Sequence, residues 1–269
     1  MYVLKDSGTD PVWTRLRLEV ESMAASETML AGYLHDTVLK HSSLEAATAY
    51  FLAGKLASPY LTALALRDII DEALVASDDI REALRRDLVA IVERDPAAGS
   101  VAHPFLHYKG FHALQSYRVA NWLWERGRKP LSLYLQNRVS EAFDVDIHPA
   151  ARIGKGILID HATSVVIGET AVVGDDVSLL HEVTLGGTGK ESGDRHPKVG
   201  DGVLIGAGAK ILGNVRIGAY SKVAAGSVVL AEVPPNSTVA GIPARVVGKP
   251  RTREPAKQMD QTFEPDYCI

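Results

Sequence analysis

The hydrophobic positions in the second half of the chain recur every six residues. From residue 199 the repeat holds without a break through Val199, Ile205, Ile211, Ile217, Val223 and Val229. An earlier run has the same period at Ile147, Ile153, Ile159 and Val165, and after a two-residue shift it continues through Ile167, Val173, Leu179 and Leu185. A period of six fits neither an amphipathic helix nor an alternating strand, whereas it is the signature of a hexapeptide β-helix. We therefore predict a parallel β-helix in which three repeats form one triangular coil around an aliphatic interior.

The first half of the chain, up to about Phe143, shows spacings that are typical of α-helices. Ser42 to Glu45 is a capping-box pattern, in which the serine accepts a hydrogen bond from the helix start and the glutamate reaches back. Ser58-Pro59 predicts a second helix start, because proline suits the first helical position. We expect this half to be a packing or oligomerisation domain.

Two longer helices are predicted nearer the middle of the chain. The first is indicated by apolar residues at helical spacing, namely Ile80, Leu84, Leu88 and Ile91. It should begin near Asp79 and end before Pro96, since proline disfavours helical geometry in the residue that precedes it. The second should run from about Gly110 to Arg126, where Gly127 suits a C-terminal cap.

The two patterns together define an α+β fold with three parts. We predict an α-helical domain over 1–143, a β-helix domain over 144–249 and a flexible tail over 250–269, where prolines, glutamates and polar residues prevail. The repeat breaks between Leu185 and Val199, so the segment 186–197 should leave the stack as a loop. This loop is either a tolerated surface insertion or a functional loop, because a rigid scaffold would hold Arg195 and His196 at its end.

Composition excludes several classes of function. The 269 residues are 46% hydrophobic and 23% charged, with a formal net charge of -4. This mild acidity gives no reason to expect a nucleic-acid partner, and charged residues interrupt the long apolar stretches, so no membrane span is predicted. The N-terminus lacks the basic and apolar regions of a secretory signal. Because Cys268 is the only cysteine in the sequence, an intramolecular disulfide is excluded and a cytoplasmic location is expected.

Local motifs narrow the choice further. They are RDPAA at 94–98, KGFHALQSYRVANWLW at 109–124, VDIHPAARIGKGILIDHAT at 145–163, VIGETAVVGDDV at 166–177, VTLGGTGKESGDRHPKVG at 183–200 and IGAGAKILGNV at 205–215. Together they resemble the serine O-acetyltransferases of bacteria and plants, over nearly all of the chain. DHAT and GDRHPK make the resemblance specific, since hexapeptide proteins in general do not share them. The resemblance implies a left-handed coil, a trimer or a dimer of trimers joined by the helical half, and a coenzyme A site between adjacent subunits.

Within that resemblance, His161 of the DHAT motif is the expected general base. It follows the inward-facing Ile159 by two residues and so lies on the outer surface of a coil. A neutral imidazole suits removal of the proton from a serine hydroxyl as the oxygen attacks the thioester of acetyl-CoA, the expected co-substrate. The family's His–Asp pair implies that Asp146 is the carboxylate that orients the imidazole. The alternative for Asp146 is a cap at the start of the β-helix.

The resemblance also implies which residues bind L-serine. Asp95 and Asp160 would hold its ammonium group and Arg195 its carboxylate, which a guanidinium can bind through two parallel hydrogen bonds. His196 would help to position the amino acid, and it is the weaker candidate for the base. Asp95 has an alternative interpretation as a helix-terminal residue before a proline.

The expected coenzyme A contacts are also ordinary turn positions of a β-helix. Small residues would let the pantetheine arm approach the backbone, and an N–H group near Gly187 could stabilise the tetrahedral oxyanion. The positions that match the family are Gly187, Thr188, Ala207 and Ala225, with Lys222 and Lys249 expected to meet phosphates.

A zinc site is an alternative use of the histidines. Some hexapeptide trimers resemble carbonic anhydrase and bind zinc between subunits through histidines, and the predicted β-helix carries His148, His161 and His181. These three lack the paired spacing of that group, so no metal is expected.

The last residues, DYCI, resemble the C-terminal tails of serine acetyltransferases, which insert into the active site of O-acetylserine sulfhydrylase. A terminal carboxylate with one apolar side chain mimics an amino-acid substrate. The resemblance thus implies a partner-binding tail, although composition alone favours a frayed end; its residues are Asp266, Tyr267, Cys268 and Ile269. Cys268 departs from expectation, because an exposed thiol is oxidisable.

The sequence therefore predicts a serine O-acetyltransferase that makes O-acetyl-L-serine and CoA by direct attack and is inhibited by L-cysteine, which resembles serine. One rival is another hexapeptide acyltransferase, acting on homoserine, a sugar or an amine. Arg195 with Asp95 and Asp160 favours an amino acid, but homoserine is only one methylene longer, which pockets discriminate modestly. The other rival is a scaffold that only holds a partner, which the pair of His161 and Asp146 disfavours.

Overall fold

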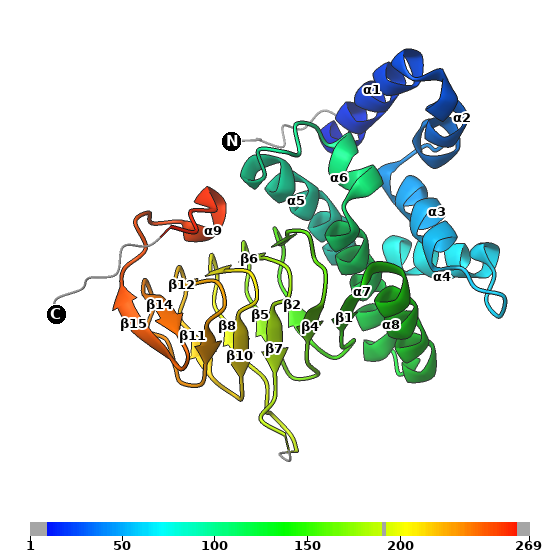
Figure 1. Cartoon of the computed structure of the whole chain (residues 1–269). Helices are drawn as coiled ribbons and strands as arrows, with labels where there is room; N and C mark the ends of the chain where they lie inside the picture. The colour runs from blue at the N-terminus through cyan, green and yellow to red at the C-terminus, as the bar shows by residue number, and fades with distance from the viewer. Residues whose placement is uncertain (1–9, 190–191, 263–269) are drawn as a thin grey trace.

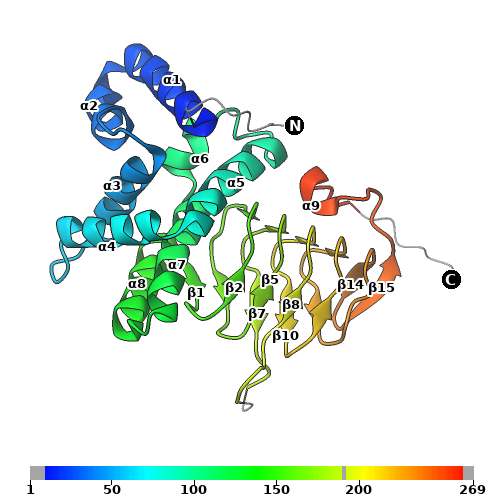
Figure 2. The same cartoon turned by 180° about the vertical axis from the view of Figure 1, so that it is seen from behind.

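The computed structural model describes residues 10–189 and 192–262, which form a group of helices at one end of a parallel β-helix (Figure 1). The helices gather at one end of the molecule, and the coils extend away from them, as the reverse view shows (Figure 2). The α-helices are α1 (Pro11–Ser26), α2 (Ala31–Leu34), α3 (Leu44–Leu56), α4 (Ala63–Ala76), α5 (Asp78–Arg94), α6 (Ala102–His107), α7 (Lys109–Glu125) and α8 (Lys129–Phe143).

The two long helices begin and end close to where the sequence predicts. Ser77 caps α5, which ends at Arg94 ahead of Pro96, and α7 is followed by Gly127 with a φ of 74°. Both predictions are confirmed. A positive φ is easily adopted by glycine, which explains why the chain can leave the helix at this residue.

The two earlier helix starts differ from their predictions. Ser43, and not Ser42, caps α3, because its Oγ accepts a hydrogen bond from the Ala46 amide at 3.2 Å. The start predicted at Ser58-Pro59 is wrong, since α4 begins after Thr62. Ser58 instead closes a turn before that helix, where its Oγ accepts from the amides of Tyr60 and Leu61. A serine can stabilise a turn or a helix start by the same type of hydrogen bond, which is why the local pattern was ambiguous.

The β-helix consists of three sheets whose strands pair in parallel, with one strand from each in every full coil, except that the last strand of sheet C pairs antiparallel with the strand before it. Sheet A contains β1 (Val145–Ile147), β4 (Val165–Ile167), β7 (Thr184–Gly186), β10 (Lys210–Leu212) and β13 (Val228–Val229). Sheet B contains β2 (Arg152–Ile153), β5 (Val172–Val173), β8 (Lys198–Val199) and β11 (Arg216–Ile217). Sheet C contains β3 (Leu158–Ile159), β6 (Ser178–Leu179), β9 (Leu204–Ile205), β12 (Lys222–Val223), β14 (Thr238–Gly241) and β15 (Ala244–Gly248). The prediction of a helical domain followed by a parallel β-helix is confirmed.

The register locates both departures from the six-residue period. Ile147 lies opposite Ile167, a step of 20 residues, whereas Ile167 lies opposite Leu185, a step of 18 residues. The two extra residues fall in the corner after β3, where His161, Ala162 and Ser164 all have a positive φ. The second departure is the loop after β7, which puts Ile211 opposite Leu185, a step of 26 residues. In both places the extra residues lie at a corner of the coil, so the inward-facing aliphatic residues of successive coils remain opposite one another.

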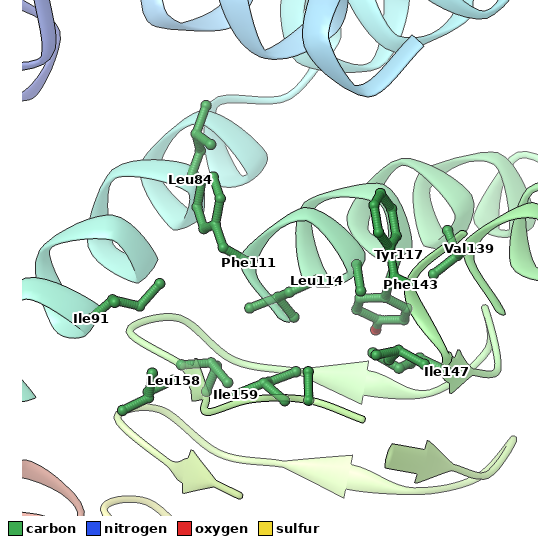
Figure 3. Close-up of a cluster of buried hydrophobic side chains, with 14 of the residues drawn as sticks. Leu84, Ile91, Phe111, Leu114, Tyr117, Val139, Phe143, Ile147, Leu158 and Ile159 are labelled. Atoms are coloured by element: carbon green, nitrogen blue, oxygen red, sulfur yellow. The ribbon is translucent and has the colours of Figure 1, made fainter. Parts of the chain in front are cut away.

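The helical domain joins the β-helix through α5 and α7, which both contact β3. Figure 3 shows the shared apolar cluster, in which Leu84 and Phe111 lie together and Ile91 and Leu114 lie on the side toward the strand that carries Leu158 and Ile159. Gly110 lies at this contact, where a Cβ would overlap the carbonyl oxygen of Ile159. A buried ion pair of 2.7 Å between Arg118 and Asp87 lies beside it, and Asp87 also accepts from the Ile157 amide. The position of α7 on the coil is therefore fixed by packing and by paired buried charges.

The segment after β15 packs back on the coils, unlike the flexible tail predicted from residue 250. Helix α9 (Pro255–Gln258) contacts α5, and the Ala256 carbonyl accepts from Ser178 Oγ at 2.9 Å. Lys222 is buried in sheet C, where its ammonium donates to the carbonyls of Asp260, at 2.8 Å, and Thr262. Composition failed to predict this because the acceptors are backbone groups, which every sequence provides. In the part of the chain that is described, no helix has the length and apolar character that crossing a membrane requires.

Candidate active site

Apart from Asp146 and Lys222, which lie on strands, and Lys249, the predicted site residues of the coils lie along two of the three edges of the β-helix. The C–A edge consists of the corners that lead from sheet C to sheet A, at residues 160–164, 180–183, 206–209 and 224–227. The A–B edge consists of the corners at 148–151, 168–171 and 213–215 and of the described parts of the loop, 187–189 and 192–197. Backbone hydrogen bonds connect successive corners of the C–A edge, from Glu182 to Thr163 at 2.7 Å, from Gly208 to His181 at 3.0 Å and from Gly226 to Ala207 at 2.8 Å. The C–A edge is thus a continuous column of hydrogen-bonded corners.

Two carboxylates meet at the top of the C–A edge. Asp160 directly follows β3, and Asp95 follows α5 at the point where that helix packs on the same strand. The Asp95 carboxylate accepts from the Tyr108 hydroxyl at 2.9 Å and from the Ala97 amide at 2.8 Å, which fixes its position. Burial raises the pKa of Asp160, and the nearby charge of Asp95 raises it further. Burial also raises the pKa of Tyr108, to about 12, so its hydroxyl stays a donor. His161 and His181 act against these two effects on Asp160, and two neighbouring carboxylates suit a cationic ligand.

His161 stands at the opening of this cluster. Its side chain is 72% exposed, and its Nε2 lies 3.8 Å from a carboxylate oxygen of Asp160. The ring of His181, one coil further on, meets it edge-on at a centroid distance of 5.7 Å. The positive φ of His161 turns the side chain outward from a corner that is two residues longer than the next. A solvent-reachable imidazole beside a carboxylate can accept a proton and be stabilised once it is charged.

Asp146 is not in the predicted contact with His161. It lies on β1 of sheet A, where its carboxylate accepts from Gln136 Nε2 of α8 at 2.6 Å. Among the described residues, no hydrogen bond connects Asp146 to His161. The carboxylate beside the imidazole in this chain is Asp160, which the sequence assigned only to the substrate.

Arg195 and His196 lie on the A–B edge. Arg195 forms an ion pair with Glu169 at 2.7 Å, and its hydrogen bond lowers the pKa of the Glu169 carboxyl. His196 lies against Gly168, where a Cβ would overlap the imidazole ring. Lys198 fastens the end of the loop, since its ammonium donates to the carbonyls of Thr170 and His196 and to the Asp194 carboxylate. The cationic part of the predicted pocket is therefore rigid, and it belongs to a different edge from the anionic part.

One chain consequently carries two halves of the predicted amino-acid pocket and does not join them. The C–A edge offers Asp95, Asp160 and His161, and the A–B edge offers Arg195 and His196. Sheet A lies between these two edges in every coil. In a triangular coil the two halves can face each other only if a second copy of the chain lies against the first.

The predicted coenzyme positions are divided in the same way. Ala207 and Ala225 continue the C–A edge one and two coils below His181, whereas Gly187 and Thr188 lie on the A–B edge, with Gly187 beside Arg195. Lys249 is exposed just after β15. Lys222 is not placed to meet a phosphate as predicted, because the carbonyls of the C-terminal segment surround its buried ammonium. The predicted tail residues 266–269 lie outside the described residues.

Of the three histidines that could be zinc ligands, His148 lies apart from the other two. His148 lies on the A–B edge, with its ring 5.1 Å from the Trp124 ring, while His161 and His181 lie on the C–A edge. Within residues 10–189 and 192–262, no group of three or more potential ligands converges on one point.

Several residues of the site were not found from the sequence. Tyr108 holds Asp95, Thr170 contacts His196, and Gly110 and Gly168 permit the close approaches on either edge. Of these residues, Gly168 could have been placed from the sequence. It directly follows Ile167, an aliphatic residue of the six-residue repeat, so the repeat predicts that it lies at a corner of the coil. Counting strands along the repeat would also have predicted on which edge each residue lies. His161 follows the third strand of its coil, whereas Arg195 follows the first strand of its coil.

Two protein-family descriptions match the chain. "Serine acetyltransferase, N-terminal" covers residues 12–116, and "Bacterial transferase hexapeptide (six repeats)" covers residues 196–231. A serine acetyltransferase of Salmonella typhimurium is 54% identical over 252 residues, which are 94% of this chain and 92% of the relative. The mitochondrial serine acetyltransferase 3 of Arabidopsis thaliana is 53% identical, over 98% of this chain and 70% of the relative.

Solved structures agree with these sequence matches. A serine acetyltransferase of Vibrio cholerae has a TM-score of 0.93 and 57% identity, covering 94% of this chain and 98% of the other. The Brucella abortus serine acetyltransferase in complex with coenzyme A has a TM-score of 0.89 and 52% identity, covering 90% and 98%. Serine acetyltransferases in complex with serine, from Neisseria gonorrhoeae, and with cysteine match with TM-scores of 0.86 and 0.92. The left-handed form of the β-helix predicted from the hexapeptide repeats is confirmed by these matches.

Proposed function

This chain belongs to the serine acetyltransferase family, and on that premise we propose that it transfers the acetyl group of acetyl-CoA to the hydroxyl of L-serine. The products are O-acetyl-L-serine and CoA, in the first step of cysteine synthesis. Family membership makes the chain an acyltransferase with acetyl-CoA as its co-substrate.

The observation that carries the proposal is the pair of carboxylates beside an exposed imidazole. Asp95 and Asp160 lie close enough for the charge of one to raise the pKa of the other. A bound ammonium group would relieve that repulsion, and it would put the hydroxyl of serine near His161. The Neisseria gonorrhoeae relative is known in complex with serine, which supports the same acceptor here.

His161 acts as the general base in the proposed reaction. Its imidazole takes the hydroxyl proton as the serine oxygen attacks the thioester carbonyl, the C–O bond forms, and the C–S bond then breaks. The departing CoA sulfur takes the proton back from the imidazolium. Asp160 lies 3.8 Å from Nε2, so its negative charge stabilises the imidazolium between the two proton transfers. Asp146 is the proposed second carboxylate. To contact His161, it would give up the hydrogen bond that it now accepts from Gln136.

We infer that the pocket is completed between subunits of a trimer. The C–A edge of one chain would face the A–B edge of the next, so that Arg195 and His196 bind the carboxylate of a serine held by Asp95 and Asp160. The pantetheine arm would follow Ala207 and Ala225, with Gly187 and Thr188 of the neighbouring subunit on its other side and Lys249 near a phosphate. Small residues on both edges support this course, because they leave the backbone open to the arm. The helical domains would join two trimers into a hexamer.

Two regulatory contacts belong to the same proposal. L-Cysteine differs from L-serine by sulfur in place of oxygen, so it should compete for the pocket and inhibit, and a relative is known in complex with cysteine. The tail residues Asp266, Tyr267, Cys268 and Ile269 would dock into O-acetylserine sulfhydrylase through the terminal carboxylate. Deleting Ile269 should abolish that binding and leave the transferase rate unchanged, and unchanged binding would contradict the tail proposal.

The decisive experiment measures release of CoA thiol from acetyl-CoA with L-serine, L-homoserine and glucosamine in parallel. Serine should react fastest, and absence of release with serine would overturn the proposed function. His161→Ala should lower kcat by roughly 10²–10⁴-fold, the usual contribution of a general base. His103→Ala, at an exposed histidine of α6, is the matched control and should keep the normal rate. A normal rate in His161→Ala would assign the base elsewhere.

A further inference from the structure

Four hydrogen bonds converge on Thr170 and on the His196 imidazole. The Thr170 hydroxyl oxygen accepts from the backbone amides of Arg195 at 3.0 Å and His196 at 3.1 Å. The Thr170 backbone amide lies 3.2 Å from His196 Nδ1, and the Thr170 hydroxyl lies 2.9 Å from the same nitrogen. One threonine thus contacts both residues of the cationic half-pocket.

These contacts determine where the proton of the imidazole resides. A backbone N–H group can only donate, so Nδ1 must accept and cannot carry a proton. The Thr170 oxygen already accepts two hydrogen bonds, and its own proton faces two acceptors, Nδ1 at 2.9 Å and the Asp194 carboxylate, whose pKa is lowered by hydrogen bonds with Lys198 and, to a smaller extent, Thr170. In the neutral ring the proton is therefore on Nε2, and protonation of Nδ1 would turn its hydrogen bond with the Thr170 backbone amide into a clash between donors.

The surroundings of the ring also disfavour its charged form. His196 is 7% exposed, and burial together with the adjacent Arg195 lowers its pKa, with Lys198 and His148 acting in the same direction and Glu169 opposing them. Its Nε2 has no hydrogen-bond partner among residues 10–189 and 192–262, although it does not belong to the polar atoms that are closed off from solvent. A neutral ring with a free Nε2–H is a donor to a ligand.

We propose that Thr170 is a positioning residue that fixes His196 as the neutral Nε2–H tautomer, so that His196 donates a hydrogen bond to the carboxylate of the acceptor beside Arg195. The inference rests on the proposed function for the identity of the acceptor, but the tautomer itself follows from the contacts of Thr170. His196 then has no free lone pair to receive a proton from the serine hydroxyl. This removes it as a second candidate for the base and leaves His161.

The test uses the full-length enzyme labelled with ¹⁵N in histidine, whose ring nitrogens distinguish protonated from unprotonated states by NMR. His196→Asn identifies the resonances. In the wild type we expect an unprotonated Nδ1 and a protonated Nε2 near neutral pH, without any substrate present. An Nδ1–H tautomer in the wild type would overturn the proposal whatever the enzyme activity. A correct tautomer in an enzyme that fails to acetylate serine would instead overturn the proposed function alone.

Thr170→Val and Thr170→Ser are a matched pair of variants. Valine keeps the shape and the backbone amide but loses the hydroxyl, so the titration midpoint of His196 should rise, because one donor to the neutral ring is lost. The KM for serine should rise about tenfold, as expected when a hydrogen bond to a charged group is misaligned, with the KM for acetyl-CoA unchanged. Thr170→Ser keeps the hydroxyl, so the titration midpoint of His196 and the KM for L-serine should both return to the wild-type values. A Thr170→Val enzyme with the wild-type midpoint and KM would refute the role of Thr170.

Discussion

At the scale of single residues, two glycines set how closely the parts of the site approach. Gly110 lets the first turn of α7 touch the carbonyl of Ile159, directly before Asp160 and His161. Any side chain there must push the helix away from the corner, and neither backbone segment can yield cheaply. The position of the C–A half-pocket therefore depends on a residue without a functional group.

Gly110→Ala should lower the free energy of unfolding by about 1–3 kcal/mol, the usual cost of overpacking, and should also reduce activity. Urea unfolding followed by circular dichroism measures the first effect and thiol release the second. Gly54→Ala in α3 is the control, because a Cβ at Gly54 meets nothing within 4 Å. Equal stability and activity of the two variants would show that α7 can move without consequence.

The paired carboxylates predict a pH effect. Asp160 must be ionised to bind an ammonium group, and burial and then Asp95 raise its pKa, so it ionises later than an ordinary aspartate as the pH rises. The acidic limb of the pH dependence of L-serine binding should accordingly lie above the ordinary carboxyl range. Asp95→Asn removes one of the two causes and should move this limb to lower pH, while raising the KM for serine throughout.

Calorimetric titration of the enzyme with L-serine across the pH range would measure that limb, because rates would also report the protonation of the base His161. Asp68→Asn, at an exposed aspartate of α4, is the control and should leave it in place. A limb that stays fixed in Asp95→Asn would mean that the two carboxylates do not interact in the enzyme.

At the scale of elements, periodic features were predictable and pairwise contacts were not. The six-residue period located the strands because the interior of the coil requires an aliphatic side chain in each one, whatever lies outside. It could not predict that Gln136 of α8 bonds Asp146, or that Lys222 bonds the carbonyls of Asp260 and Thr262, since these partners belong to separate elements. The helix start predicted at Ser58 was wrong for another reason. The Ser58 hydroxyl stabilises a turn, and it could equally have stabilised a helix start.

The C-terminal element offers a test of the buried lysine. Lys222→Met keeps an unbranched side chain of similar length but removes the donors, so the Asp260 and Thr262 carbonyls lose their partner. We expect faster amide exchange in the segment 255–262, measured by hydrogen–deuterium exchange mass spectrometry, with the exchange of β9 and β12 little changed. Lys249→Met, at an exposed position, should change neither. Protection of 255–262 equal to that of the wild type would show that α9 holds the segment alone.

At the scale of the whole molecule, the division of the pocket between two edges predicts complementation. His161→Ala disables the C–A half of a chain and Arg195→Ala weakens the A–B half. If each pocket joins halves from adjacent subunits, random trimers of the two variants in equal amounts should contain about one quarter intact pockets. The co-expressed mixture should then be far more active than either variant alone. Activity no greater than the average of the two separate variants would mean that one chain supplies both halves.

The column of corners below His161 has a consequence for the dimensions of the cofactor. Successive coils are separated by about 4.8 Å, and the backbone bonds between corners allow no intermediate spacing. Along the C–A edge, the positions that could contact a cofactor are therefore spaced by whole coils. From His161 they are His181, then Ala207, then Ala225. An arm lying along this edge reaches the reacting imidazole only if its length matches a whole number of coils. Removing one 18-residue coil would shift every more distant contact by one step and leave Asp160 and His161 untouched, so in this architecture the reach of the cofactor and the chemistry can change independently.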